Sequence, residues 1–138
     1  MTMDRVWDDG RRALRFGAAT PVGALFDAVP LAARYPTYPL YFSIWIKPRV
    51  SQTQWRTILA ATSSALWADG ISLYFDDATS LHLSFKGYDS DKVVATLDSS
   101  VAEWSHIVGG YDGANTTIYI NGALAVTGAK AAETGGPQ

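Results

Sequence analysis

Residues 104–122 carry the pattern that most limits what this chain can fold into. Along residues 104–111 the side chains alternate between two sides, with His106 and Val108 on one and Ile107 on the other. This two-residue period is that of a β-strand, because successive side chains of a strand point to opposite faces. The stretch therefore predicts a strand with two distinct faces.

A turn and a hairpin follow this strand. Residues 112–115 read Asp-Gly-Ala-Asn, which is turn chemistry, because Asp bonds its own backbone and Gly adopts positive φ at no steric cost. Residues 116–120 are β-branched and aromatic, which favours a second strand. Asn121-Gly122 predicts a type I′ turn, whose central residues both need positive φ. With residues 123–126 as the return strand, the segment forms a three-strand meander.

The composition indicates one domain and excludes several kinds of site. A chain of 138 residues buries roughly two thirds of its unfolded surface, which suffices for one core. The absence of cysteine excludes disulfides, thiolate zinc sites and a cysteine nucleophile. The net charge of −2 and the scattered cations argue against a nucleic-acid partner. No apolar run approaches the length of a membrane span, so none is expected.

Strand-like segments recur through the rest of the chain. Residues 40–47 are apolar on both faces, which predicts a strand that is buried on both sides or central in its sheet. Residues 71–75, 81–85 and 92–97 follow at a spacing of about ten residues, with turn residues between them. Four prolines between residues 17 and 39 argue against a long helix there. This pattern predicts an all-β sandwich.

Alternation within residues 81–86 predicts which side chains face solvent. The apolar set is predicted to face the core: Leu81, Leu83 and Phe85. The polar set is predicted to face outward: His82, Ser84 and Lys86. The second histidine, His106, lies on a different strand, and we expect both histidines to be structural.

Four motifs in this order resemble the laminin-G-like, concanavalin A-like jelly-roll domains. They are residues 12–16 (Arg-Ala-Leu-Arg-Phe), 42–48 (Phe-Ser-Ile-Trp-Ile-Lys-Pro), 70–75 (Gly-Ile-Ser-Leu-Tyr-Phe) and the meander of 104–122. The resemblance implies a two-layer antiparallel β-sandwich over residues 12–127, opened by the strand at 12–16. Residues 1–11 are then an N-terminal arm and residues 128–138 a C-terminal tail. Fold alone does not determine function.

The segment 55–66 can be interpreted in two ways, and the resemblance favours one of them. The apolar residues of 55–66 have helical spacing and alanines that favour a helix. The resemblance implies instead a strand at about 56–61, which we expect because the surrounding elements are β.

Relatives continue past the Asn-Gly hairpin with two more strands, whereas nothing after Thr127 has strand composition. We therefore expect a jelly roll that lacks its last strands and has an open sheet edge. The arm around Val6 and Trp7 from a neighbouring subunit, or the rest of a longer protein, is expected to cover that edge.

The glucanases of this fold carry a Glu-x-Asp-x-(x)-Glu strand, and this chain has none. Hydrolysis of a glycosidic bond needs two carboxyl groups about 5 Å apart, or about 6.5–9.5 Å apart for inversion. The only glutamates are Glu103 and Glu133, far apart in the chain. We expect no catalytic residues and no enzymatic activity.

Two acidic turns have a metal interpretation and a structural one. Asp76 with Asp77, and Asp89 with Asp91, could supply oxygen ligands to Ca²⁺, which related domains often bind at a sheet rim. The alternative is that Asp stands in turns because it bonds its own backbone. No cofactor is required by either interpretation, and calcium is the metal to test.

Loop aromatics are the candidate ligand-binding residues. They are Trp67, Tyr88, Tyr35 and Tyr38, which could stack on sugar rings or simply cover sheet edges. The N-terminus lacks the basic-then-apolar pattern of a signal peptide, so a targeting segment is either absent or outside this sequence.

Two functions follow from these observations. The first is a non-catalytic structural or adhesion subunit of a larger assembly, such as a virion decoration or fibre protein of a phage, with other protein subunits as partners. The second is a glycan-binding, lectin-like module, with or without calcium. Both imply a virion or extracellular surface as the location. Measuring glycan binding with and without a chelator separates the two.

Overall fold

The computed structural model describes residues 5–8, 11–14, 39–48, 51–52, 56–61, 71–85 and 92–129. These residues form ten β-strands and no helix. The strands are β1 (Arg5–Asp8), β2 (Arg11–Leu14), β3 (Leu40–Ile46), β4 (Arg56–Ala61), β5 (Ile71–Phe75), β6 (Ser80–Phe85), β7 (Lys92–Thr96), β8 (Ser105–Tyr111), β9 (Asn115–Ile120) and β10 (Ala123–Ala129). These residues contain no helix that is long and apolar enough to cross a membrane.

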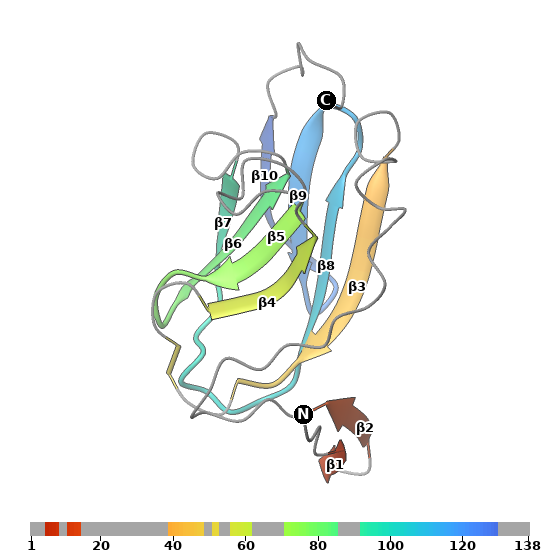
Figure 1. The fold of residues 1–138 in the computed structure, drawn as a ribbon. Helices are drawn as coiled ribbons and strands as arrows, with labels where there is room; N and C mark the ends of the chain where they lie inside the picture. The colour runs from red at the N-terminus through yellow and green to blue at the C-terminus, as the bar shows by residue number, and fades with distance from the viewer. Residues whose placement is uncertain are drawn as a thin grey trace.

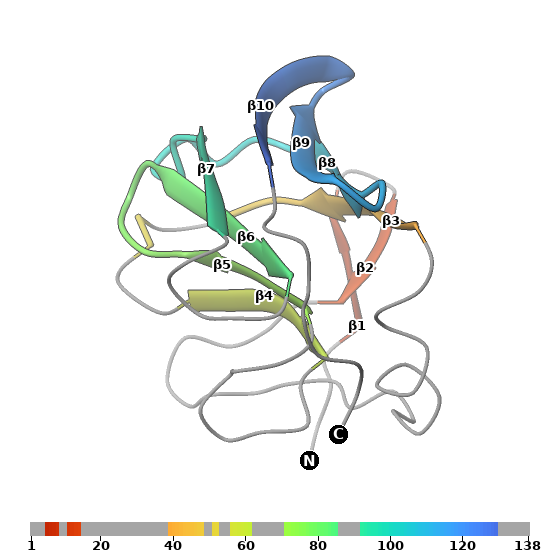
Figure 2. The same cartoon turned by 90° about the horizontal axis from the view of Figure 1, so that it is seen from above.

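Eight of the strands form two four-stranded antiparallel sheets. One sheet has the order β10-β9-β8-β3 and the other the order β4-β5-β6-β7. Figures 1 and 2 show them as two layers, with β10 next to β7 on one side of the molecule. The predicted all-β sandwich is confirmed. Residues 56–61 form a strand because β5 supplies its backbone partners, which overrides their helical spacing.

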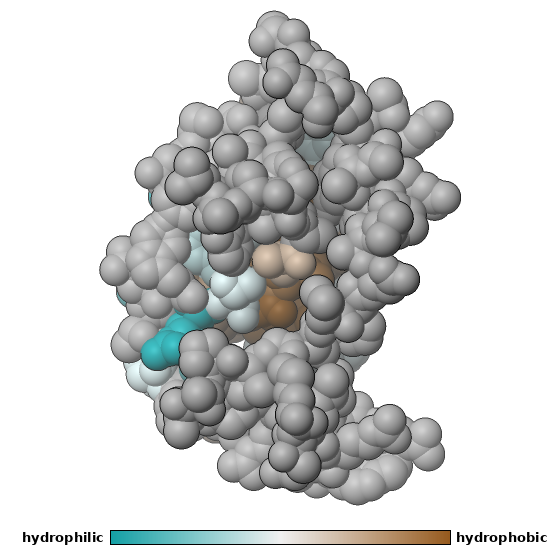
Figure 3. All heavy atoms as spheres, viewed as in Figure 1, coloured by the Kyte–Doolittle hydropathy of each residue, from teal (hydrophilic) through white to brown (hydrophobic). Residues whose placement is uncertain are grey.

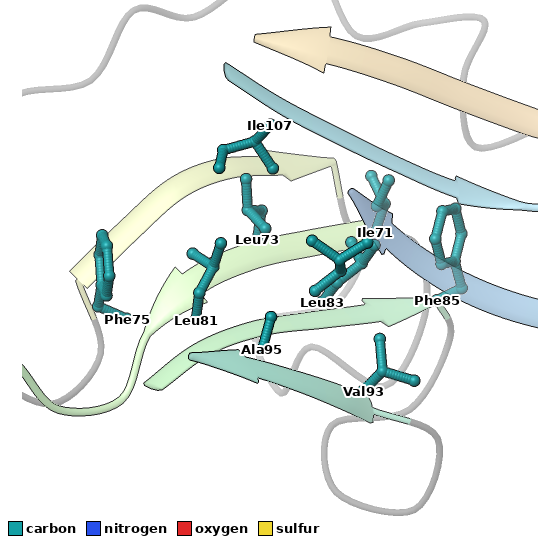
Figure 4. Packing of buried hydrophobic residues seen from close by; sticks show 10 residues of the cluster. Ile71, Leu73, Phe75, Leu81, Leu83, Phe85, Val93, Ala95 and Ile107 are labelled. Atoms are coloured by element: carbon teal, nitrogen blue, oxygen red, sulfur yellow. The ribbon is translucent and has the colours of Figure 1, made fainter. Parts of the chain in front are cut away.

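The core lies between the two layers and contains mostly aliphatic side chains. Leu73, Leu81 and Leu83 of one sheet meet Ile107 and Ile118 of the other, and all five are fully buried. Figure 4 shows the three leucines and Ile107 pointing into the space between the sheets. Burying one such side chain stabilises the fold by about 1.5–3 kcal/mol. The core thus comes from the alternation predicted for residues 81–85 and 104–111.

The predicted three-strand meander is β8, β9 and β10, paired in sequence order. Asn121 and Gly122 form the tight turn, with φ of 52° and 84°. Both values lie in the left-handed region that a type I′ turn requires. Between Leu124 and Val126 the β10 register shifts by one residue, which is a β-bulge.

Close packing between the sheets requires a glycine in β8. A Cβ atom on Gly109 would collide with the Phe42 ring and would lie 2.8 Å from Cδ2 of Leu83. Only a residue without a side chain leaves room for the ring at this position. Gly109 therefore leaves room for the Phe42 ring and lets Leu83 of β6 pack close to β8.

The prediction that His82 and Ser84 face solvent is wrong. They lie on the face of β6 opposite Leu83, as the alternation requires, but are only 5% and 3% exposed. Nδ1 of His82 lies 3.2 Å from the hydroxyl of Tyr74 on β5, which is also buried. Alternation assigns a side chain to a face of the sheet, but it does not indicate whether that face is covered. Lys86 lies outside the described residues.

Figure 3 looks onto this side of the sandwich. Hydrophobic atoms of described residues are visible near the centre of the view, and hydrophilic ones toward its lower left.

The N-terminal strands differ from the expectation. Residues 12–16 were expected to form the first strand of the sandwich, but β2 pairs with β1 in a separate two-stranded sheet. In this hairpin Val6 is opposite Ala13 and Trp7 is opposite Arg12. Strand β1 finds its hydrogen-bond partner nearby in the sequence, which costs little loop entropy. The domain boundaries at residues 12 and 127 stay predictions.

Candidate binding surface

The sheet β10-β9-β8-β3 has one face toward the core and one turned away from it, here called the outer face. In Figure 2 the outer face looks upward, and no described strand lies beyond it. The register aligns its side chains in rows across the strands. The residues of the outer face are Tyr41, Ser43 and Trp45 of β3, His106, Val108 and Gly110 of β8, Thr117 and Tyr119 of β9, and Leu124 and Thr127 of β10.

Large apolar side chains on the outer face are exposed. Tyr41 is 55% exposed, Trp45 51%, Tyr119 38% and Leu124 57%. They come from three strands, and the register places Tyr119 directly beside Leu124. Apolar side chains that gather on one face, rather than scatter singly, mark an interaction site. Tyr and Trp suit such sites because each has an apolar body and a polar group.

Trp45 and His106 form the centre of one row. They are paired across β3 and β8, and their rings stack with centroids 4.9 Å apart and planes 27° from parallel. On the same face, Oγ of Ser43 lies 2.7 Å from Nε2 of His106. The imidazole is thus held between an aromatic ring and a hydroxyl. A ligand would meet a preorganised surface, which reduces the entropy lost on binding.

Tyr41 lies flat on the sheet at the other end of β3. It is paired with Gly110, and a Cβ atom on Gly110 would collide with the Tyr41 ring. The glycine therefore leaves room for the ring to rest on the β8 backbone. The exposed face of the ring is available for contacts.

The outer face contains no carboxylate, ammonium or guanidinium group. None of β3, β8, β9 and β10 contains Asp, Glu, Lys or Arg. Its polar groups are hydroxyls, the indole N–H of Trp45 and the imidazole of His106, and two of the hydroxyls, on Thr117 and Thr127, lie 3.2 Å apart. Such a surface suits an uncharged ligand, because a charged group buried against it would lose hydration without gaining an ionic partner.

The predicted ligand-binding aromatics lie outside the described residues. These are Trp67, Tyr88, Tyr35 and Tyr38. The predicted assembly residues Val6 and Trp7 lie in β1, where only the backbone is described. These assignments stay predictions.

Sequence reasoning missed the outer face because it misplaced β3. The strand is apolar on both faces, and this pattern predicts a central or doubly buried strand. In the described sheet β3 is instead an edge strand, with Tyr41 and Trp45 exposed. His106 and Val108 were assigned to one face of their own strand, but no local signal in the sequence indicated that β3 pairs with that strand.

The predicted metal residues Asp76 and Asp77 lie in the turn between β5 and β6. Oδ1 of Asp77 accepts hydrogen bonds from the N–H groups of Thr79 and Ser80, both at 2.7 Å, and from Oγ1 of Thr79 at 3.1 Å. Its Oδ2 accepts one from Oγ of Ser80 at 2.8 Å. These bonds, above all that from the Thr79 backbone, lower the pKa of Asp77.

The carboxylate of Asp77 thus fits the structural interpretation of an Asp that holds its own turn. Oδ1 of Asp76 is buried and has no hydrogen-bond partner among the described residues. No three acidic or histidine side chains of the described residues gather as a metal site would need. Since Asp89 and Asp91 lie outside those residues, calcium binding stays a prediction.

Comparison with known proteins agrees with the fold. Residues 27–137 match the family model of the concanavalin A-like lectin/glucanases superfamily. This range includes every strand of both four-stranded sheets. No curated protein matches the chain.

Proposed function

Since this chain belongs to the concanavalin A-like lectin/glucanases superfamily, we propose that it is a non-catalytic module that binds a neutral glycan on its outer face. The observation that carries the proposal is the exposed Trp45, stacked on His106 and flanked by Ser43. The location that fits this role is a virion or extracellular surface, where glycans are met.

The chemistry of the outer face matches that of a sugar. A pyranose ring has an apolar side of C–H groups and a rim of hydroxyls. The apolar side can stack on the Trp45 and Tyr119 rings, which supply large contact areas at low entropy cost. The rim can exchange hydrogen bonds with the hydroxyls of Ser43 and Tyr41 and with the imidazole of His106. Neither partner carries a carboxylate, ammonium or guanidinium group that would have to be neutralised.

The lack of catalysis is proposed from the carboxylates. Hydrolysis of a glycosidic bond needs two carboxyl groups beside the bond. None of the four strands that form the outer face contains Asp or Glu. Glu103 is exposed in the connection before β8, and Glu133 lies outside the described residues. We expect no release of sugar from β-glucans at any pH, and turnover lost on Glu103→Gln would refute this.

The test is binding to a panel of neutral oligosaccharides and polysaccharides. Trp45→Ala is expected to weaken binding by at least about tenfold, since it removes the central stacking ring. The matched control is Val94→Ala, an exposed apolar residue of β7 in the other sheet, 44% exposed in the structure. It should leave affinity unchanged.

Each measurement is repeated with a chelator, which tests the calcium expectation separately. Melting temperatures of both variants show whether the fold is intact. Absence of binding to any neutral glycan, or equal loss in both variants, would contradict the proposal.

A second candidate is the structural subunit of a larger assembly, such as a virion decoration or fibre protein. It is favoured by the apolar character of the outer face, since Tyr and Trp are also enriched in protein interfaces. Its test is whether Trp45→Ala abolishes association with the other subunits while glycans have no effect on that association. Competition between glycan and subunits would place both on one surface.

A further inference from the structure

Two aromatic side chains stand on the outer face of strand β3, one near each end. Tyr41 and Trp45 are both about half exposed, and the side chain between them on this face is that of Ser43. A strand rises about 3.4 Å per residue, so the Cα atoms of Tyr41 and Trp45 are about 13 Å apart. The register with β8 is unbroken over this length, so no bulge shortens the separation.

The two rings occupy separate positions on the sheet. The Trp45 ring stacks on His106, with centroids 4.9 Å apart. The Tyr41 ring lies over Gly110, further along β8. Each ring is thus supported by a different part of β8, and neither reaches the other without leaving its support. The outer face therefore has two stacking positions along β3.

A hydrogen-bonding group lies between these two positions. Oγ of Ser43 is 2.7 Å from Nε2 of His106. A hydroxyl has one donor and two acceptor lone pairs, so Ser43 keeps capacity for a further hydrogen bond to a ligand. Its partner on β8, Val108, adds an apolar side chain beside it. Strand β3 thus presents a ring, a hydroxyl and a second ring in one line.

We propose that the ligand of the outer face is an extended chain of several neutral sugar rings, which lies along β3 from Trp45 to Tyr41. This inference rests on the proposed function and specifies its ligand. One sugar ring is about as large as one aromatic ring, so a single sugar covers only one stacking position. A chain places one sugar on Trp45, another on Tyr41, and the hydroxyls of a sugar between them beside Ser43.

The sheet offers a second path, which runs across the strands. Tyr119 lies in the row of Ser43, two strands away and about 10 Å across the sheet. Leu124 is next to it on β10. A chain that crossed the strands through Tyr119 and Leu124 would leave Tyr41 unused. The two paths therefore predict different effects of a change at Tyr41.

The first experiment measures affinity against chain length by isothermal titration calorimetry. The probes are cello-, malto- and manno-oligosaccharides, from single sugars to chains of about six rings. We expect affinity for the series that binds to rise by at least about tenfold once the chain reaches both rings, because the second ring adds its contact area. Longer chains should gain little more. Binding that is equally tight at every length would overturn this inference and leave the proposed function intact.

The second experiment asks which ring causes the dependence on chain length. Tyr41→Ala is expected to weaken binding of the long chains by at least about tenfold more than binding of the short ones. The matched variant Tyr119→Ala removes the same ring from the same face but off the line, and should weaken all lengths by a common factor. If Tyr119→Ala removes the length dependence and Tyr41→Ala does not, the chain crosses the strands and the inference is wrong.

Melting temperatures show whether these variants are folded. If Tyr41→Ala does not fold, Tyr41→Leu tests the same point, because its aliphatic side chain still covers Gly110 but offers no aromatic ring. Tyr41→Phe keeps the ring and should keep the preference for long chains. If no probe binds the wild-type chain at any length, the proposed function and this inference both fail.

Discussion

The side chain of Asn121 completes the backbone ladder of His106. Oδ1 of Asn121 accepts a hydrogen bond from the His106 N–H at 2.8 Å, and the Asn121 N–H donates to the His106 carbonyl at 2.8 Å. The turn residue thus acts as one more strand residue beside β8. Because the ring of His106 also stacks on Trp45, this residue links the hairpin turn to the centre of the outer face through hydrogen bonds and a ring contact.

Gly122→Val should strongly destabilise the fold. Gly122 has a φ of 84°, where a β-branched residue is a severe outlier, so we expect a loss of about 1–3 kcal/mol. Denaturant unfolding followed by circular dichroism measures this loss. Gly122→Asn is the control, because Asn tolerates positive φ and should retain most of the stability. An unchanged midpoint in the valine variant would contradict the hairpin assignment.

Gly109→Ala and Gly110→Ala should differ although they are neighbours. The new methyl group at Gly109 would collide with the Phe42 ring inside the core, so we expect a loss of about 1–3 kcal/mol. At Gly110 it would meet the ring of Tyr41, which is exposed and can rotate away. Thermal melting of both variants tests this difference. Equal losses would show that the Tyr41 ring is as constrained as that of Phe42.

Ser99→Ala should cost about 1–3 kcal/mol, because it removes a buried hydroxyl with two partners. Oγ of Ser99 donates to the Ala78 carbonyl and accepts from the Gln52 N–H, both at 2.8 Å. It joins three separate segments. Ser100→Ala is the matched control, since its exposed hydroxyl bonds Asp98 in the same turn. If the control loses as much stability, Ser99 does not join these segments.

Thr116→Val should leave the free energy of unfolding unchanged or raise it by about 1 kcal/mol. The hydroxyl of Thr116 is buried and has no hydrogen-bond partner among the described residues. Its removal therefore breaks no hydrogen bond and avoids the cost of burying an unpaired hydroxyl. Thr117→Val, on the opposite face, is the control, since that hydroxyl lies 3.2 Å from Thr127. A clear loss in Thr116→Val would reveal a hydroxyl partner.

Acid should selectively remove the contribution of Asp112. Hydrogen bonds from the N–H groups of Asn115 and Ala114 lower the pKa of this carboxyl below its ordinary value of 3.8. A lowered pKa stabilises the fold above the unfolded value and loses that effect as the pH falls through the folded one. The stability difference between wild type and Asp112→Ala should therefore shrink below pH 3.8. A difference that is constant with pH would refute the role of the charge.

The strands and turns with strong local signals were predictable from the sequence. The Asn121-Gly122 turn needs two residues that tolerate positive φ, and few other pairs do. The alternation of Leu81, Leu83 and Phe85 assigned them to the core because a strand places every second side chain on one face. Residues 56–61 needed the resemblance, because their helical spacing competes with a strand until β5 provides partners.

Local patterns assigned side chains to faces, and only the tertiary structure decided which faces are covered. Phe42 and Trp45 are both large, apolar and on one strand, yet Phe42 packs against the core and Trp45 is half exposed. His82 looked like a solvent-facing residue and is buried. Ser43 and His106 are 63 residues apart in the chain and meet only because β3 pairs with β8. Burial and contact depend on which strands become neighbours, and no local sequence window contains that information.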